Sequence, residues 1–160
     1  MSIVGGRKAR RRGGCRSTPY RRSSRVPAKY LLDSDVCILA VRKGNASLTR
    51  LVSAIRPDGL AISVITYGEV REGVLYSRDP ARNAAVWADF VAGVDVVDVT
   101  MTIADVWAEV RGALRERGRP VSDNDLLIAA TALRFGMTVV SGNLRHFGHI
   151  PGLNVLLAER

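Results

Sequence analysis

The sequence has few cysteines and no long apolar segment. Its 160 residues include two cysteines, Cys15 and Cys37, and their spacing matches neither a metal-binding motif nor a dense disulfide framework. No stretch reaches the roughly 18 consecutive apolar residues that a membrane-spanning helix needs. These absences argue against a disulfide-stabilised secreted domain and against a membrane protein. We therefore expect a soluble, cytoplasmic protein that works in a reducing compartment.

Acidic residues are missing from residues 1–29. This segment holds ten of the 24 Lys and Arg residues and no Asp or Glu, which leaves 14 basic and 15 acidic residues in 30–160. The net charge of +9 therefore belongs to the first segment, and the rest of the chain is nearly neutral. Because the segment mixes Arg with Gly, Ser and Pro, we expect a disordered Arg-rich tail. It could be a phosphate-contacting arm, a solvated tail, or the product of a start codon placed too far upstream.

From Tyr30 onward, short apolar runs alternate with amphipathic stretches of helical length. This alternation is typical of β-α units, so it predicts an α/β fold around a mostly parallel sheet, in one domain that spans 30–157. Gly118 with Pro120, and Gly136, are expected to end two of the helices. Strands are predicted at about 30–33, 60–64, 94–99, 137–141 and 154–157. Helices are predicted at about 35–42, 46–56, 67–77, 80–92, 102–117 and 124–135.

Two carboxylates follow the first predicted strand. Asp33 comes directly after Leu31 and Leu32, and Asp35 follows two residues later, at the carboxyl end of a strand, where open α/β sheets usually bind ligands. A carboxylate in this position is poorly solvated and needs a cation or several hydrogen-bond donors, and Mg²⁺ is a cation that prefers oxygen ligands. The alternative is that one of the two aspartates only caps the helix that follows.

A second and a third acid follow the same pattern. Glu69 comes after the second strand, but Thr66 and Glu69 have the spacing of a capping box, which would explain the glutamate without catalysis. Asp123 and Asp125 begin an almost uniformly apolar helix, where the helix dipole favours negative charge. Ser122 and Asp125 again have capping-box spacing, yet two carboxylates exceed what one cap requires. Asn124, between them, is a candidate hydrogen-bond donor.

A fourth polar turn follows the predicted strand at 137–141. Asn143 there can offer a carbonyl oxygen to a metal-bound water but no negative charge. His146 and His149 come next, and each is more typical of a surface or packing residue than of a catalytic base. This position is therefore weaker evidence for a site than the three acids.

The polar residues are expected to converge. The strand ends after residues 32, 65 and 141 share one edge of a parallel sheet, and carboxylates that would repel one another there are tolerated when a divalent ion neutralises them. Such an all-oxygen site is suited to phosphodiester hydrolysis, because the ion polarises the phosphate and lowers the pKa of a bound water. The residues therefore predict a Mg²⁺-dependent nuclease in which Asp33 and Asp125 hold the metal.

Four segments resemble the PIN-domain ribonucleases and, within them, the VapC-type toxins of type II toxin-antitoxin pairs. The likeness spans about residues 30–157, and the four segments occur in the family's order. They are LLDSDV at 31–36, ISVITYGEV at 62–70, GRPVSDNDLLIAA at 118–130 and VVSGNLRHFGHIPGL at 139–153.

The resemblance implies a three-layer α/β/α fold, Mg²⁺ or Mn²⁺ as cofactor, an RNA substrate, a VapB-like antitoxin and a homodimer. Asp33, Glu69 and Asp125 match the family's three acids, and Asn143 stands where many members have an aspartate, which leaves a second metal ion in question. Ser34 matches a hydroxyl residue that hydrogen-bonds a neighbouring carboxylate. Asp35 and Asp123 match auxiliary positions that vary between acids and amides.

Two other interpretations remain open at the level of sequence. Residues 33–36 fit the D-x-D-x-[TV] opening of haloacid-dehalogenase-like phosphatases, although that chemistry usually needs a lysine near the phosphate and the chain has none after Lys43. Alternatively, the chain is a PIN-fold binding module with impaired catalysis. Because the domain is nearly neutral, attraction of RNA would depend on local cations. The candidates are Arg42, Lys43, Arg71 and Arg145.

Overall fold

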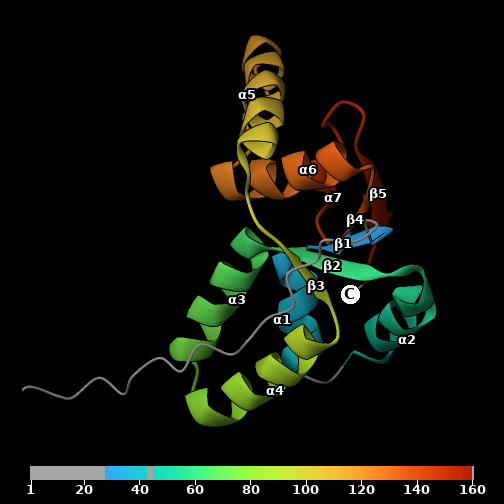
Figure 1. Cartoon of the computed structure of the whole chain (residues 1–160), viewed down its shortest axis with the longest axis vertical. Helices are drawn as coiled ribbons and strands as arrows, with labels where there is room; N and C mark the ends of the chain where they lie inside the picture. Colours follow the sequence, from blue (N-terminus) through green and yellow to red (C-terminus); the bar gives the residue numbers. More distant parts are fainter. Residues whose placement is uncertain (1–27, 43–44, 160) are drawn as a thin grey trace, which may run out of the picture.

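The computed structural model describes residues 28–42 and 45–159, so the predicted Arg-rich tail, apart from its last two residues, and Lys43 lie outside the described part. The centre of the fold is a five-stranded sheet in the order β3-β2-β1-β4-β5 (Figure 1). Every strand pairing is parallel, which confirms the predicted α/β class. The strands are β1 Tyr30–Leu32, β2 Leu60–Ser63, β3 Asp95–Val97, β4 Thr138–Ser141 and β5 Asn154–Leu157.

Helices connect the strands and cover both faces of the sheet. They begin and end within about three residues of the predicted positions, and one short helix, α7, was not predicted. The helices are α1 Ser34–Arg42, α2 Ala46–Ile55, α3 Val64–Leu75, α4 Pro80–Ala92, α5 Met101–Glu116, α6 Asp123–Phe135 and α7 Leu144–Phe147, with a 3₁₀ turn, η1, at Arg56–Asp58. None of the helices in the described ranges is both long and apolar enough to span a membrane.

Neighbouring residues of a strand face opposite sides of the sheet and enter different cores. Leu32 belongs to the core under α1, α2, α3 and α4, whereas Leu31 belongs to the core under α5, α6 and α7. Figure 1 shows the two groups of helices on opposite sides of the sheet, with α5 projecting beyond α6. The central strands are buried on both faces, as their continuous apolar sequences indicate. The chain therefore forms the expected three-layer α/β/α arrangement.

The register of the sheet aligns the ends of its central strands. Leu32 pairs with Ile62 of β2 and with Val140 of β4. The Asp33 backbone N–H donates to the Val140 carbonyl, with 3.0 Å between nitrogen and oxygen. The residues that follow β1, β2 and β4 are consequently neighbours at one edge, where the sequence placed its polar turns.

Two glycines end helices as the sequence predicts. Gly136, the C-cap of α6, has φ of 65° and ψ of 28°, and Gly118, just beyond α5, has φ of 63°. Both are left-handed conformations that glycine adopts without steric cost.

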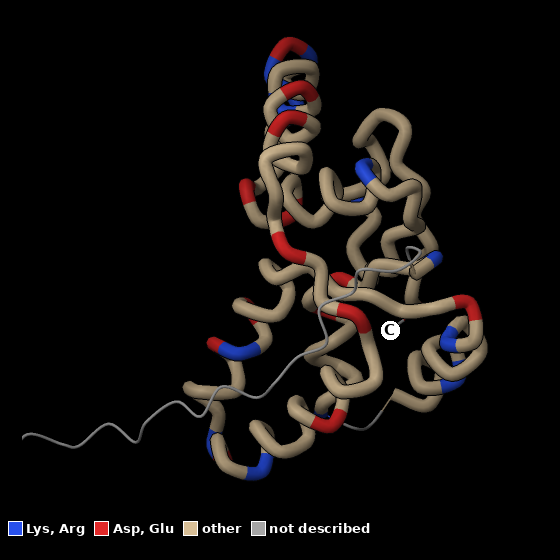
Figure 2. Tube along the Cα trace, in the orientation of Figure 1, with Lys and Arg blue, Asp and Glu red and all other residues tan. Residues whose placement is uncertain are grey.

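Figure 2 shows charges of both signs along α5, in keeping with the near neutrality of residues 30–160.

Candidate active site

Asp33 is a buried carboxylate at the junction of β1 and α1. It is 5% exposed. Its Oδ1 accepts a hydrogen bond from the Ser34 backbone N–H at 2.7 Å, and its Oδ2 accepts one from the Ser141 hydroxyl at 2.8 Å. Its carbonyl accepts the Cys37 N–H, so Asp33 stands directly before α1. A position at the start of the helix and a place in the site are therefore compatible here.

The environment of Asp33 opposes its ionisation. Burial is the main reason that the pKa of Asp33 rises from an ordinary 3.8 to about 7. The negative charges of Asp35 and Asp125 raise this pKa further, while the hydrogen bonds from Ser141 and Ser34 lower it. A carboxylate in these surroundings is stabilised in its charged form by a nearby cation.

Ser141, at the end of β4, joins Asp33 to the polar turn that follows. Its hydroxyl donates to Asp33 and accepts a hydrogen bond from the Asn143 backbone N–H at 2.9 Å. In the same turn, the Gly142 N–H donates to the two oxygens of Asp35 at 3.1 and 3.4 Å. These bonds fix the turn that carries Asn143 against the start of α1.

Glu69 is not part of a capping box, so that interpretation is wrong. Helix α3 begins at Val64, earlier than predicted, and its N-cap is Ser63, whose hydroxyl accepts the Ile65 N–H at 3.2 Å. Glu69 therefore lies in the second turn of the helix. Its Oε2 accepts a hydrogen bond from the Ser34 hydroxyl, as the resemblance implied, and its Oε1 accepts one from the Asn124 amide at 2.7 Å.

Asp125 combines capping with a place in the site. Ser122 is the N-cap of α6; its hydroxyl accepts the Asp125 backbone N–H at 3.2 Å and donates to the Asp125 Oδ2 at 2.7 Å. The same Oδ2 lies 2.8 Å from Nδ1 of His146. Asp123 points elsewhere: its carboxylate is 2.6 Å from the Arg111 guanidinium, and its side chain is 60% exposed.

These elements meet at a hollow of about 370 Å³, the acidic hollow. It contains all four of the residues that the sequence selected as catalytic, together with Ser34 and Asp35, whereas Asp123 and His149 lie outside it. Sequence reasoning missed Glu72, one turn after Glu69 on the same helix face, and gave little weight to His146. The acidic hollow is lined by Asp33, Ser34, Asp35, Ile38, Glu69, Glu72, Asp125, Asn143 and His146.

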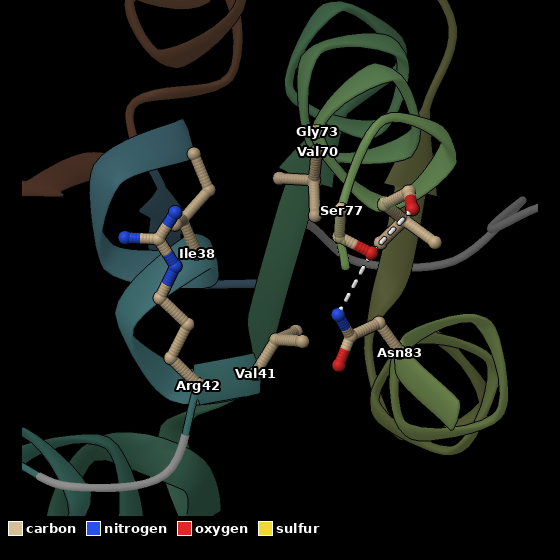
Figure 3. A pocket seen from close by; sticks show the side chains of 8 residues that line it. Ile38, Val41, Arg42, Val70, Gly73, Ser77 and Asn83 are labelled. Atoms are coloured by element: carbon tan, nitrogen blue, oxygen red, sulfur yellow. Dashed lines mark hydrogen bonds between the residues drawn. The ribbon is translucent and has the colours of Figure 1, made fainter. Parts of the chain in front are cut away.

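Two further hollows adjoin the acidic hollow. One shares Asn143 and His146 with it and continues to Arg145, one of the predicted RNA-attracting cations. The other, of about 90 Å³, is mostly apolar and lies between α1, α3 and α4, where Figure 3 shows Ile38, Val41 and Val70 around it. Ile38 lines both this apolar hollow and the acidic hollow.

The donor atoms suit Mg²⁺, although the described residues contain no group of three or more His, Cys, Asp or Glu side chains arranged as a ready-made metal site. Mg²⁺ usually keeps several waters and is held by only one or two protein carboxylates, with oxygen as the ligand atom. Asp33 and Asp125 offer such oxygens, and because burial raises the pKa of Asp33, a cation beside it would offset the cost of its negative charge. The residues present therefore fit the ion that the sequence implied.

Comparisons with known proteins identify the family of this fold. The profile of the PIN domain matches residues 30–153. A tRNA(fMet)-specific endonuclease VapC from Shigella flexneri is 33% identical over 125 residues, which cover 78% of this chain and 94% of that protein. The chain is also similar to solved structures. DNA-bound VapBC from Salmonella typhimurium shows 30% identity and a TM-score of 0.77, covering 83% of this chain and all of that one.

A VapBC-5 structure from Mycobacterium tuberculosis, described as a member of the VapBC family of toxin-antitoxin systems, shows 30% identity and a TM-score of 0.63, over 84% of this chain and all of that one. These matches span most of the described residues and leave no support for a haloacid-dehalogenase-like phosphatase. The sheet, the acidic hollow and the similar proteins together show that the chain belongs to the PIN-domain family, as a ribonuclease toxin of the VapC type.

Proposed function

We propose that the chain is an endoribonuclease that depends on Mg²⁺, with Mn²⁺ as an alternative, and that it is the toxin of a toxin-antitoxin pair. The observation that carries this proposal is the convergence of Asp33, Glu69 and Asp125, from three separate elements, on one hollow. The relative from Shigella flexneri is named as an endonuclease of tRNA, which supports RNA as the substrate class.

Asp33 and Asp125 would hold the ion, and the remaining side chains would hold water and substrate. When bound, Mg²⁺ supplies the positive charge that polarises a phosphodiester and lowers the pKa of a water molecule. Glu69, fixed by Ser34 and Asn124, presents a carboxylate that can accept a proton or hydrogen bond from water. Asn143, whose backbone is fixed by Ser141, can hydrogen-bond the water or the phosphate without adding negative charge.

RNA would enter along the hollows that meet at His146 and Asn143. Arg145 lines the adjoining hollow and is exposed, so its guanidinium can approach a phosphate next to the one that is cut. The carboxylates alone would repel RNA. Attraction therefore has to come from the bound ion and from local cations such as Arg145 and Arg42.

An antitoxin of the VapB type is the proposed protein partner, because the similar solved structures from Salmonella and Mycobacterium are described as VapBC. The apolar hollow supports this partner, since a chain that covers Ile38 there would also cover one wall of the acidic hollow.

A homodimer is proposed as well. Leu75 is 56% exposed on α3 and could contribute apolar contact area, while Leu48, Val70 and Val74 are buried in the core.

The test compares cleavage of a mixed RNA substrate by wild type, Asp125→Asn and Asp123→Asn. Each is assayed with Mg²⁺ and with EDTA, after circular dichroism has shown that all three are folded. Asp123→Asn is a matched control because it also removes a carboxylate from the first turn of α6. That carboxylate pairs with Arg111 and lies outside the hollow. We expect metal-dependent cleavage by wild type and by Asp123→Asn, and none by Asp125→Asn.

Other outcomes would change the proposal. Equal cleavage by Asp125→Asn would remove this residue from metal binding, and cleavage in EDTA would remove the ion from the mechanism. RNA retention without cleavage by any folded variant, with or without metal, would favour a binding module with impaired catalysis.

A further inference from the structure

His146 contacts the acidic site through a defined atom. Its Nδ1 is 2.8 Å from the Asp125 Oδ2, and the ring lines both the acidic hollow and the adjoining one. The backbone of His146 is held in place, because the next residue, Phe147, is fully buried and the His146 N–H donates to the Asn143 carbonyl at 3.2 Å. The backbone from which the imidazole reaches Asp125 is therefore fixed.

The polar contacts of Asp125 fall on one of its two oxygens. Oδ2 accepts a hydrogen bond from the Ser122 hydroxyl at 2.7 Å and lies 2.8 Å from His146 Nδ1. Within the described residues, no hydrogen bond reaches Oδ1. A neutral imidazole donates from Nδ1 when its proton is on that nitrogen, and a protonated one does so as well, so this contact does not depend on the charge of the histidine.

Asp33 and Glu69, the other two acids that the sequence selected as catalytic, differ from Asp125. Asp33 accepts one hydrogen bond on each oxygen, from Ser34 N–H and the Ser141 hydroxyl. Glu69 also accepts one on each, from the Ser34 hydroxyl and the Asn124 amide. Of these three acids, Asp125 is the one with an oxygen that accepts no hydrogen bond within the described residues.

We propose that His146 is a positioning residue that, together with Ser122, holds Asp125 by its Oδ2 so that Oδ1 is the atom offered to the metal ion. The proposal rests on the proposed function, since it assigns a ligand atom within that site. Hydrogen bonds to a ligating carboxylate fix its orientation, and the loss of such a partner typically lowers metal affinity about 10- to 100-fold.

The test measures Mn²⁺ affinity of the full-length protein without RNA, by electron paramagnetic resonance of free Mn²⁺, together with kcat and KM for RNA cleavage. Three variants separate the two ring nitrogens. His146→Ala removes both, His146→Asn puts an amide donor near the position of Nδ1, and His146→Gln puts one near that of Nε2. Arg145→Ala is the control for Mn²⁺ affinity. Arg145 precedes His146 in the chain, but its side chain makes no contact with Asp125 among the described residues.

We expect His146→Ala and His146→Gln to bind Mn²⁺ about 10- to 100-fold more weakly and to lower kcat more than they change KM. His146→Asn should restore most of the affinity, and Arg145→Ala should bind Mn²⁺ as wild type does. Because the His146 side chain is 51% exposed, these variants are expected to fold, which circular dichroism checks.

Two results would overturn the proposal while the metal site itself survives. In the first, His146→Ala binds Mn²⁺ like wild type although Asp125→Asn does not, so the contact is only an exposed ion pair. In the second, His146→Ala binds Mn²⁺ more tightly, so the histidine competes with the ion. If Asp125→Asn also leaves Mn²⁺ affinity unchanged, the proposed function fails together with this inference.

Discussion

The starts of helices α1 and α6 each place an aspartate in the acidic hollow, but in opposite surroundings. Asp33 is 5% exposed and is held by a backbone N–H and a buried hydroxyl, and burial raises its pKa to about 7. The Asp125 side chain is 19% exposed and is held by the hydroxyl of its own cap and by an imidazole at the rim. As a metal ligand, Asp33 is thus restricted mainly by the energetic cost of its negative charge. Asp125 is restricted mainly by the orientation of its carboxylate.

The largest expected effect concerns the charge of Asp33. In the metal-free fold, Asp33 binds its proton more tightly than in the unfolded chain, so its contribution to stability is complete below about pH 4 and is lost as the pH rises toward 7. Between pH 5 and 7, wild type in EDTA should lose about 2 to 3 kcal/mol of unfolding free energy relative to Asp33→Asn, at about 1.4 kcal/mol per pH unit. Urea unfolding at the two pH values measures this difference.

Adding Mg²⁺ sharpens the same measurement. Since the ion binds the ionised carboxylate, it should stabilise wild type more at pH 7 than at pH 5, and it should stabilise Asp33→Asn much less at either pH. Parallel pH profiles for wild type and Asp33→Asn in EDTA would show that Asp33 ionises without cost, and the contrast with Asp125 would disappear.

Ser141→Ala should have the next largest effect. The substitution leaves the buried Asp33 Oδ2 and the Asn143 N–H without their shared hydroxyl. The unfolding free energy should fall by about 1 to 3 kcal/mol, the usual cost of an unsatisfied buried polar group. Urea unfolding at pH 7 gives the value, and Ser53→Ala, an exposed serine on α2, is the control. Equal losses in the two variants would mean that the Ser141 hydroxyl has no special role.

Ser122→Ala is expected to cost less, about 1 kcal/mol, because it removes the cap of an exposed helix end. It also removes the hydroxyl that donates to the Asp125 Oδ2, so Mn²⁺ affinity should fall along with stability. Ser122→Thr keeps the hydroxyl and should retain most of both quantities. If Ser122→Thr loses as much as Ser122→Ala, the hydroxyl is not what holds Asp125.

The smallest expected effect belongs to Asp123→Asn. Its pair with Arg111 is exposed and should contribute less than about 1 kcal/mol, even though Arg111 is placed over the Trp107 ring at 4.6 Å from its centroid. Thermal unfolding and RNA cleavage should both stay near wild type. A loss of cleavage as large as that of Asp125→Asn would show that Asp123 acts in the site and that the start of α6 has two working carboxylates.

The sequence predicted the fold class and most element positions, because buried strands, apolar helix faces and terminal glycines leave local patterns. The start of α3 was placed three residues too late, since the N-cap Ser63 is also the last residue of the fully buried strand β2 and so does not stand out. Helix α7 has four residues, too few for a periodic pattern to show.

Within the site, the sequence identified the residues that follow strands and begin helices. It could not identify the contacts between elements. The bond from Asn124 to Glu69 joins residues 55 positions apart, and the contact between His146 and Asp125 depends on how α7 packs against α6. Such contacts are set by tertiary packing, and only the hydroxyl of Ser34 was anticipated as a partner for a neighbouring acid.

The alternation of Leu31 and Leu32 between the two cores bears on how this site can change. Inserting one residue into β1 would exchange the side chains that the strand sends to each face and would shift Asp33 away from Ser141 and from the start of α1. The register of the three β1 residues thus determines which side chains pack in each core. It also determines where the buried acid lies. Replacing a single side chain at this edge keeps the register of the sheet, whereas an insertion or deletion in β1 changes it.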